Sequence, residues 1–232
     1  MNRRLFGVLS IVTALATGCT FPAAGADPGP TPKPSKPTTA SPSAKTISTA
    51  LGRVKVVAAR PKVAGYQRDR FGGAWSDSHD GLGGHNGCDT RNDVLAAQLK
   101  NLKYRGKSQC VVIAGTLVAD PYTGKTIEFR KAKATEVQID HIYPLSRAWD
   151  MGASKWPQQR RVDFANDEAD NLLAVGGSAN MSKGDSGPGE WLPINRKYSC
   201  TYVLRYLQAA RKWSLPITAA DRDSVKAINR TC

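Results

Sequence analysis

The stretch that decides the fold reads Val137-Gln138-Ile139-Asp140-His141-Ile142-Tyr143-Pro144. Its first three residues favour a β-strand, and Pro144 ends that strand because proline has no amide hydrogen to donate. Asp140 and His141 therefore stand at the end of the strand, where a turn would let both side chains reach one small polar site. An isolated acid–imidazole pair is more often a surface turn, so other residues must support any chemistry assigned to it.

Three further polar residues follow this pair along the chain. A second short apolar run is opened by Asn171, and Asn180 lies nine residues after it. Lys183 comes three residues later. In chain order the polar residues are therefore an acid, an imidazole, two amides and an ammonium. This series makes the stretch a candidate catalytic site.

The order and spacing of these residues resemble the HNH nuclease family, whose fold is the ββα-metal finger. In that family the strand ends in Asp-His or His-His, an Asn lies on a loop, and a helix supplies a third residue. The likeness is to small secreted bacterial HNH endonucleases and runs from about Tyr66 to Cys232. It includes three further segments, Cys88–Asp93, Asp120–Gly124 and Phe164–Asp167. The final His of the family name is Asn180 in this chain.

The resemblance implies an α+β fold with a ββα-metal core, flanking helices and disulfides. It also implies a metal-dependent endonuclease that cuts DNA, or RNA. The sequence shows no reader module such as a zinc finger or a helix-turn-helix, so low sequence specificity is expected. His141 would be the general base, and Asn171 would orient its imidazole or tie down its loop. Asp140 and Asn180 would hold one divalent cation, Mg²⁺ first, with Mn²⁺ or Ca²⁺ as alternatives. Lys183 would contact a phosphate at or beside the scissile bond.

The residue types suit this chemistry on physical grounds. An imidazole has an ordinary pKa of about 6.5, which suits a general base at neutral pH. Carboxylate and amide oxygens are hard donors of the kind that Mg²⁺ takes beside waters and substrate phosphates. A bound cation would neutralise the charge that develops in phosphodiester hydrolysis.

The charge of the chain points to a polyanionic partner. The formal net charge is +14, and residues 1–50 contribute five cations and one acid, so +10 remains on residues 51–232. Such an excess attracts nucleic acid, but also anionic lipid or a wall polymer. A non-catalytic cationic lipoprotein that binds nucleic acid or wall polyanions is therefore the alternative function. Arg91, in the first turn of a predicted helix, is a candidate phosphate ligand, with an ion pair to Asp89 or Asp93 as the alternative.

The N-terminal residues read as an export signal over residues 1–26, so the protein is expected outside the cytoplasm. The basic start and short apolar run can end at an ordinary cleavage site after Ala26. They can also end at a lipoprotein site before Cys19, which would give membrane attachment. Residues 27–50 are rich in Pro, Ser and Thr and are predicted to form a disordered linker. Residues 51–232 are predicted to form one nuclease domain, and a monomer is expected.

The five cysteines favour two disulfides. Once Cys19 is set aside or removed, four remain. Cys200 and Cys232 are equidistant from Pro216, in the turn between two predicted helices, and antiparallel packing would bring them together. We therefore predict the bridges Cys200–Cys232 and Cys88–Cys110.

Two other segments carry alternatives. Residues 66–75 interleave aromatics and arginines that can stack on and pair with nucleic acid. Packing of Phe71 and Trp75 in the core is the favoured interpretation. The Asp120–Gly124 turn is predicted to join a strand over 110–118 to one over 126–129, with Asp120 and Tyr122 as turn and surface residues. A helix with Thr90 as its cap is predicted, with its apolar stripe reaching Leu102.

Overall fold

The computed structural model describes residues 41–232. The predicted export signal, Cys19 and residues 27–40 of the predicted linker lie outside the described residues. Helices and strands are mixed along the described part, which confirms the predicted α+β class. Within this range no helix combines the length and the apolar composition that crossing a membrane requires.

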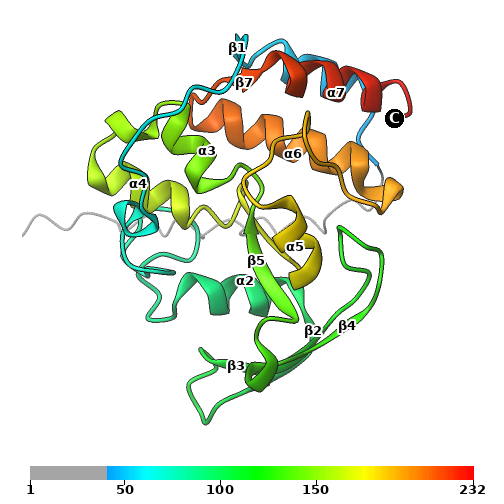
Figure 1. Cartoon of the computed structure of the whole chain (residues 1–232). Helices are drawn as coiled ribbons and strands as arrows, with labels where there is room; N and C mark the ends of the chain where they lie inside the picture. Colours follow the sequence, from blue (N-terminus) through cyan, green and yellow to red (C-terminus); the bar gives the residue numbers. More distant parts are fainter. Residues whose placement is uncertain (1–40) are drawn as a thin grey trace, which may run out of the picture. The chain divides into compact units, whose positions relative to one another are not determined.

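Short elements dominate the fold (Figure 1). The helices are α1 (Ala44–Leu51), α2 (Thr90–Gln98), α3 (Leu145–Asp150), α4 (Gln158–Ala165), α5 (Gly177–Lys183), α6 (Ser199–Lys212) and α7 (Ala219–Asn229). The strands are β1 (Val56–Val57), β2 (Lys100–Tyr104), β3 (Val112–Leu117), β4 (Ile127–Arg130), β5 (Val137–His141), β6 (Leu172–Gly176) and β7 (Ile217–Thr218).

A strand–strand–helix unit carries the predicted site. β5 and β6 are antiparallel neighbours, with Asp140 opposite Leu173 and His141 opposite Leu172. Helix α5 begins immediately after β6, so the unit has the order β5, β6, α5, and helices α3 and α4 are inserted between its strands. Asp140 and His141 are still within the paired strand, and the turn comes only after them. The expectation that a turn at this pair redirects the side chains is therefore wrong.

The two faces of the β5–β6 pair belong to two different hydrophobic cores. Leu173 and Val175 pack with residues of α3, α6 and α7. Leu172 and Ala174 pack with residues of α2, β3 and β4. Because side chains alternate along a strand, the pair is buried on both sides. Figure 1 shows β5 lying between the helices and the three-stranded β2–β3–β4 sheet.

The folded part begins earlier than the sequence predicted. Helix α1 starts within the predicted linker, where Ser43 caps it by accepting a bond from the amide of Thr46 at 3.3 Å. Ile47 is fully buried in the helical core, and α1 packs on α6 and α7. The predicted boundary at residue 51 was too late because one buried isoleucine in a Pro/Ser/Thr-rich stretch is enough to dock a short capped helix.

The region after Cys88 also differs from the prediction. The cap of α2 is Asp89, whose carboxylate accepts from the amide of Asn92 at 2.9 Å. The Thr90 hydroxyl instead donates to the Ser76 carbonyl. The helix ends at Gln98, and the chain continues as β2, which pairs with β3. The predicted hairpin of β3 and β4 is present.

Both predicted disulfides are confirmed. Cys88 is bonded to Cys110, with their Cα atoms 5.1 Å apart, and Cys200 to Cys232, with their Cα atoms 5.9 Å apart. The first bridge ties the segment before α2 to the start of β3. The second ties the start of α6 to Cys232, three residues after the end of α7.

Candidate functional site

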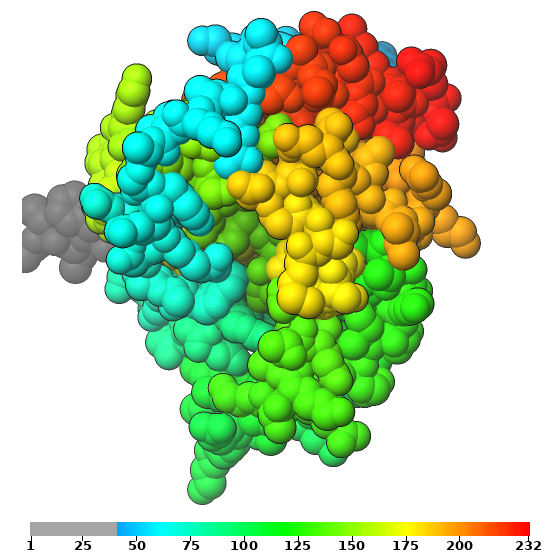
Figure 2. All heavy atoms as spheres, in the orientation of Figure 1, coloured from blue at the N-terminus to red at the C-terminus, as the bar shows by residue number. Residues whose placement is uncertain are grey.

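A hollow opens between the loop around residues 60–75 and helix α5 (Figure 2). It corresponds to a cavity of about 270 Å³. Its lining includes Asp140 and His141 from the end of β5 and Asn180 from α5. The strand–strand–helix unit thus brings these three residues, predicted from spacing, to one cavity.

Asp140 is held by two buried donors. Its Oδ2 accepts from the Tyr122 hydroxyl, and its Oδ1 accepts from the Lys183 ammonium at 2.9 Å. Lys183 also donates to the carbonyl of His141 at 2.9 Å. Burial lowers the pKa of Lys183, and the Asp140 carboxylate acts in the opposite direction. The pair fixes the end of β5 against α5.

The prediction that Lys183 contacts a phosphate is corrected by this geometry. Its side chain is 1% exposed and its ammonium is spent on Asp140 and the backbone. The polar end of a lysine in the last turn of α5 points inward because the carboxylate lies inside.

Arg91 is likewise not at the site. It donates to the carbonyls of Ala134 and Val137 and lies over the Phe129 ring. Burial lowers the pKa of Arg91. Arg91 packs between α2 and the strands. The structure supports neither the phosphate role nor the alternative ion pair to Asp89 or Asp93.

Two oxygen atoms suit a hard cation. The Asn180 side-chain amide donates through Nδ2 to Gln138 Oε1 at 2.8 Å, which fixes the amide so that Oδ1 is the free acceptor. No donor to this Oδ1 is found among residues 41–232. The Asp140 carboxylate keeps lone pairs beyond its two donors. The donor set fits a divalent cation with few protein ligands and several waters, as Mg²⁺ accepts. No cluster of three or more His, Cys, Asp or Glu with metal-binding geometry occurs in the described part of the chain.

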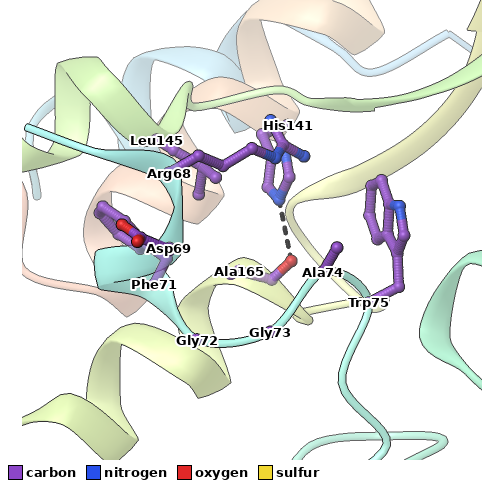
Figure 3. A pocket seen from close by; sticks show the side chains of 10 residues that line it. All are labelled: Arg68, Asp69, Phe71, Gly72, Gly73, Ala74, Trp75, His141, Leu145 and Ala165. Carbon is purple, nitrogen blue, oxygen red and sulfur yellow. Dashed lines mark hydrogen bonds between the residues drawn. The ribbon is translucent and has the colours of Figure 1, made fainter.

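His141 is a buried neutral imidazole with one defined tautomer. Its Nε2 lies 2.8 Å from the carbonyl oxygen of Ala165, shown dashed in Figure 3. A carbonyl only accepts, so Nε2 carries the proton and Nδ1 holds a free lone pair. Burial, and then the nearby Arg68 guanidinium, lowers the pKa of His141 to about 3. At neutral pH the ring is therefore unprotonated and its Nδ1 lone pair is available, while the low pKa makes it a weaker base than a free imidazole.

Asn171 acts on the loop rather than on the imidazole. Its Oδ1 accepts from the amide of Tyr143 at 2.8 Å, and its Nδ2 donates to the carbonyl of the same residue at 3.3 Å. Its own carbonyl accepts from the amide of Ile142. Asn171 thus fixes the turn that follows His141, one of the two roles predicted for it. It is a positioning residue and not a catalytic one.

The sequence reasoning missed one part of the site, Tyr122. Tyr122 and Asp120 are fully buried, not surface residues. The Asp120 carboxylate accepts from the amide of Gly176 at 3.1 Å, which anchors the turn to the start of α5 and delivers Tyr122 to Asp140. The only signal in the sequence was that this turn is one of the segments in which the chain resembles HNH endonucleases.

The loop that contains Arg68 lies within residues 66–75, for which contact with nucleic acid was the alternative prediction. The Trp75 ring is stacked on the His141 imidazole, with centroids 5.6 Å apart and an interplanar angle of 10°. Arg68 lies 5.7 Å from the centre of the Trp75 ring. The sequence reasoning favoured core packing for Phe71 and Trp75. Phe71 is buried, but Trp75 is half-buried and covers one face of the candidate base.

Comparisons with known proteins give one relative and one family. An uncharacterized secreted protein of Arthroderma benhamiae is 33% identical over 235 residues and covers all of both chains. The two disulfides and this secreted relative are consistent with the predicted export. No solved structure matches. The family described as GmrSD restriction endonucleases, C-terminal domain, matches residues 89–225, a range that contains β5, β6 and α5. The chain therefore belongs to the nuclease family of the GmrSD restriction endonuclease C-terminal domain.

Proposed function

We propose that the protein is an exported, metal-dependent HNH-type endonuclease that hydrolyses phosphodiester bonds of DNA with low sequence specificity. The observation that carries the proposal is the shared cavity of Asp140, His141 and Asn180 at the end of β5. RNA is a second substrate of the same chemistry. One chain supplies all three residues, so we propose that the monomer is active.

His141 would take the proton of the attacking water. Its Nδ1 lone pair is free among the described residues, and its proton on Nε2 is held by Ala165. The Ala165 carbonyl would also stabilise the imidazolium that forms, since it accepts a bond from the ring throughout. Trp75 on one ring face and the fixed turn after His141 restrict the imidazole to one orientation.

Asp140 and Asn180 would hold the divalent cation, with Mg²⁺ as the first candidate and Mn²⁺ or Ca²⁺ as others. When bound, such an ion polarises the phosphate and neutralises charge on the departing oxygen. Tyr122 and Lys183 keep the Asp140 carboxylate in place for it. Lys183 also makes Asp140 a weaker cation ligand than a free carboxylate, so we expect modest metal affinity.

Supercoiled plasmid incubated with purified protein and Mg²⁺, Mn²⁺ or a chelator tests the proposal. We expect nicking with at least one of the two ions and none with the chelator. Equal nicking in chelator would contradict the metal requirement. Plasmid retardation without nicking in every condition would favour the polyanion-binding alternative.

The Asn180 ligand can be tested separately. Asn180→Ala should raise the metal concentration needed for half-maximal nicking by roughly tenfold or more, because one of two protein ligands is lost. Ser178→Ala, on an exposed position of the same helix, is the matched control and should leave that concentration unchanged.

A further inference from the structure

A second cavity lies beside His141, on the side away from α5. Its volume is about 290 Å³, and its lining includes Arg68, residues 71–75, Leu145 and His141 (Figure 3). Small-molecule sites in proteins usually measure about 300–1,000 Å³, so this cavity has room for one compact group. Its walls are mainly apolar, and it shares both His141 and Arg68 with the cavity of the proposed metal site.

The backbone conformation of the loop that lines this cavity keeps the cavity open. A Cβ at Gly73 would meet nothing within 4 Å, so the backbone here borders empty space. Gly72 has a φ of +91°, and a Cβ there would lie 2.7 Å from a methyl carbon of Val162. Only glycine lets the loop approach α4 this closely. Trp75 also has a positive φ of 57°, a conformation that bulky residues rarely adopt. The strain is retained at the residue that stacks on His141.

Two charged residues line the cavity, Arg68 and Asp69, and Arg68 is the one that lies beside His141. Arg68 is exposed, and no hydrogen bond or ion pair to it is formed by any residue from 41 to 232. By contrast, Arg60 is paired with Asp150 and Asp185, and Arg147 is paired with Asp221. Arg68 borders both cavities, and its side chain extends across the pocket in Figure 3 towards His141. A free guanidinium beside the candidate base matches a phosphate, to which it can donate two parallel hydrogen bonds.

We propose that this cavity is a subsite for one unpaired nucleobase, and that Arg68 binds the phosphate of the same nucleotide. The inference rests on the proposed nuclease function and deepens it, since it names the strand state of the substrate. The apolar walls would take the flat face of a base, which stacks favourably on such surfaces whatever its sequence. A paired base remains inside the duplex stack and reaches the cavity only by flipping out. The subsite therefore favours single-stranded nucleic acid, or duplex at sites that open easily.

Binding of small probes in the presence of chelator tests the subsite without requiring cleavage. The probes are thymidine 5′-monophosphate and 2-deoxyribose 5-phosphate, which differ by the base. We expect the wild-type protein to bind the nucleotide roughly tenfold more tightly than the sugar phosphate, by calorimetry or NMR titration. Equal affinities, or no binding of either probe, would overturn the subsite and leave the nuclease proposal standing. Binding as expected by a protein that never nicks plasmid would overturn the nuclease proposal instead.

Two pairs of variants separate the base from the phosphate. The methyl group of Ala74 points into the cavity in Figure 3. Ala74→Leu should therefore abolish the preference for the nucleotide, while Ala74→Ser should keep it. Arg68→Gln should weaken the binding of both probes by a similar factor and leave the ratio of their affinities unchanged. Arg70→Gln makes the same change of charge two residues away, outside both cavities, and should bind both probes like the wild type. Retention of the preference in Ala74→Leu would contradict the proposal.

Discussion

Two buried ion pairs in this molecule look alike but stand in different surroundings. Arg147 and Asp221 are both 0% exposed and join α3 to α7, with 2.6 Å between Nη2 and Oδ2. Lys183 and Asp140 join α5 to β5, with 2.9 Å between Nζ and Oδ1. Each pair links elements that are distant in sequence. The second pair borders the cavity of the candidate metal site through Asp140.

The donors to each carboxylate explain the difference. Asp221 receives four, from Arg147, the amides of Thr218 and Gly189, and the Tyr206 hydroxyl. Asp140 receives two, and Asn180 Oδ1 next to it has none among the described residues. The four donors to the Asp221 carboxylate all come from the fold itself. The Asp140 carboxylate and Asn180 Oδ1 can still accept a bond from a ligand. This free accepting capacity, rather than burial, distinguishes the pair at the functional site.

Breaking the core pair should have the largest effect on stability. Asp221→Ala leaves the buried Arg147 with only the half-exposed Glu190 as partner and removes the box that caps α7. We expect a loss of about 3–5 kcal/mol in the free energy of unfolding, measured by urea denaturation. Asp223→Ala on the exposed face of the same helix is the control and should leave the denaturation midpoint unchanged. A fully stable Asp221→Ala protein would show that the core pair is not structural.

Breaking the Lys183–Asp140 pair should lower the free energy of unfolding by less, and it should reveal the cation site. Lys183→Met leaves the Asp140 carboxylate with Tyr122 and the cavity, so we expect a loss of about 2 kcal/mol in metal-free protein. Mg²⁺ should then raise the melting temperature of the variant more than that of the wild type, because no ammonium competes for the carboxylate. Lys197→Met, at an exposed position, should respond to Mg²⁺ like the wild type. An equal Mg²⁺ response in Lys183→Met would place the cation elsewhere.

The pH dependence of stability gives a smaller effect with a defined sign. The pKa of His141 is about 3 in the folded protein and about 6.5 in the unfolded chain. Below pH 6.5 the unfolded chain takes up a proton that the folded protein refuses. The contribution of His141 to the free energy of unfolding is therefore fully present above pH 6.5. It is lost as the pH falls towards 3, by up to about 1.4 kcal/mol per pH unit.

His141→Gln isolates this effect. Between pH 7 and pH 5 we expect the wild type to lose about 1–2 kcal/mol more than the variant, by urea denaturation at each pH. The pKa of Glu168 is raised to about 7 by burial and acts with the opposite sign, but it is present in both proteins and cancels. Parallel pH profiles of the two proteins would show that His141 is not a buried neutral imidazole.

The strand–strand–helix unit could be predicted from the sequence because its signals are local. The strand before Asp140 and the run after Asn171 follow from apolar runs and a proline, and Asn180 follows from its spacing. The roles of Lys183 and Tyr122 could not be predicted, since each is set by a contact with Asp140 across the fold. The place of Arg68 depends on how the loop packs through Phe71 and Gly72. No local pattern encodes that packing.

The rate of plasmid nicking by His141→Ala, at saturating Mg²⁺ or Mn²⁺, tests the central claim most directly. His85→Ala is the matched control, because His85 is an exposed histidine that lines neither cavity. The account predicts that His141→Ala remains folded and nicks about 10²–10⁴-fold more slowly than the wild type, while His85→Ala keeps the wild-type rate. Nicking by folded His141→Ala at the wild-type rate would contradict the assignment of His141 as the base.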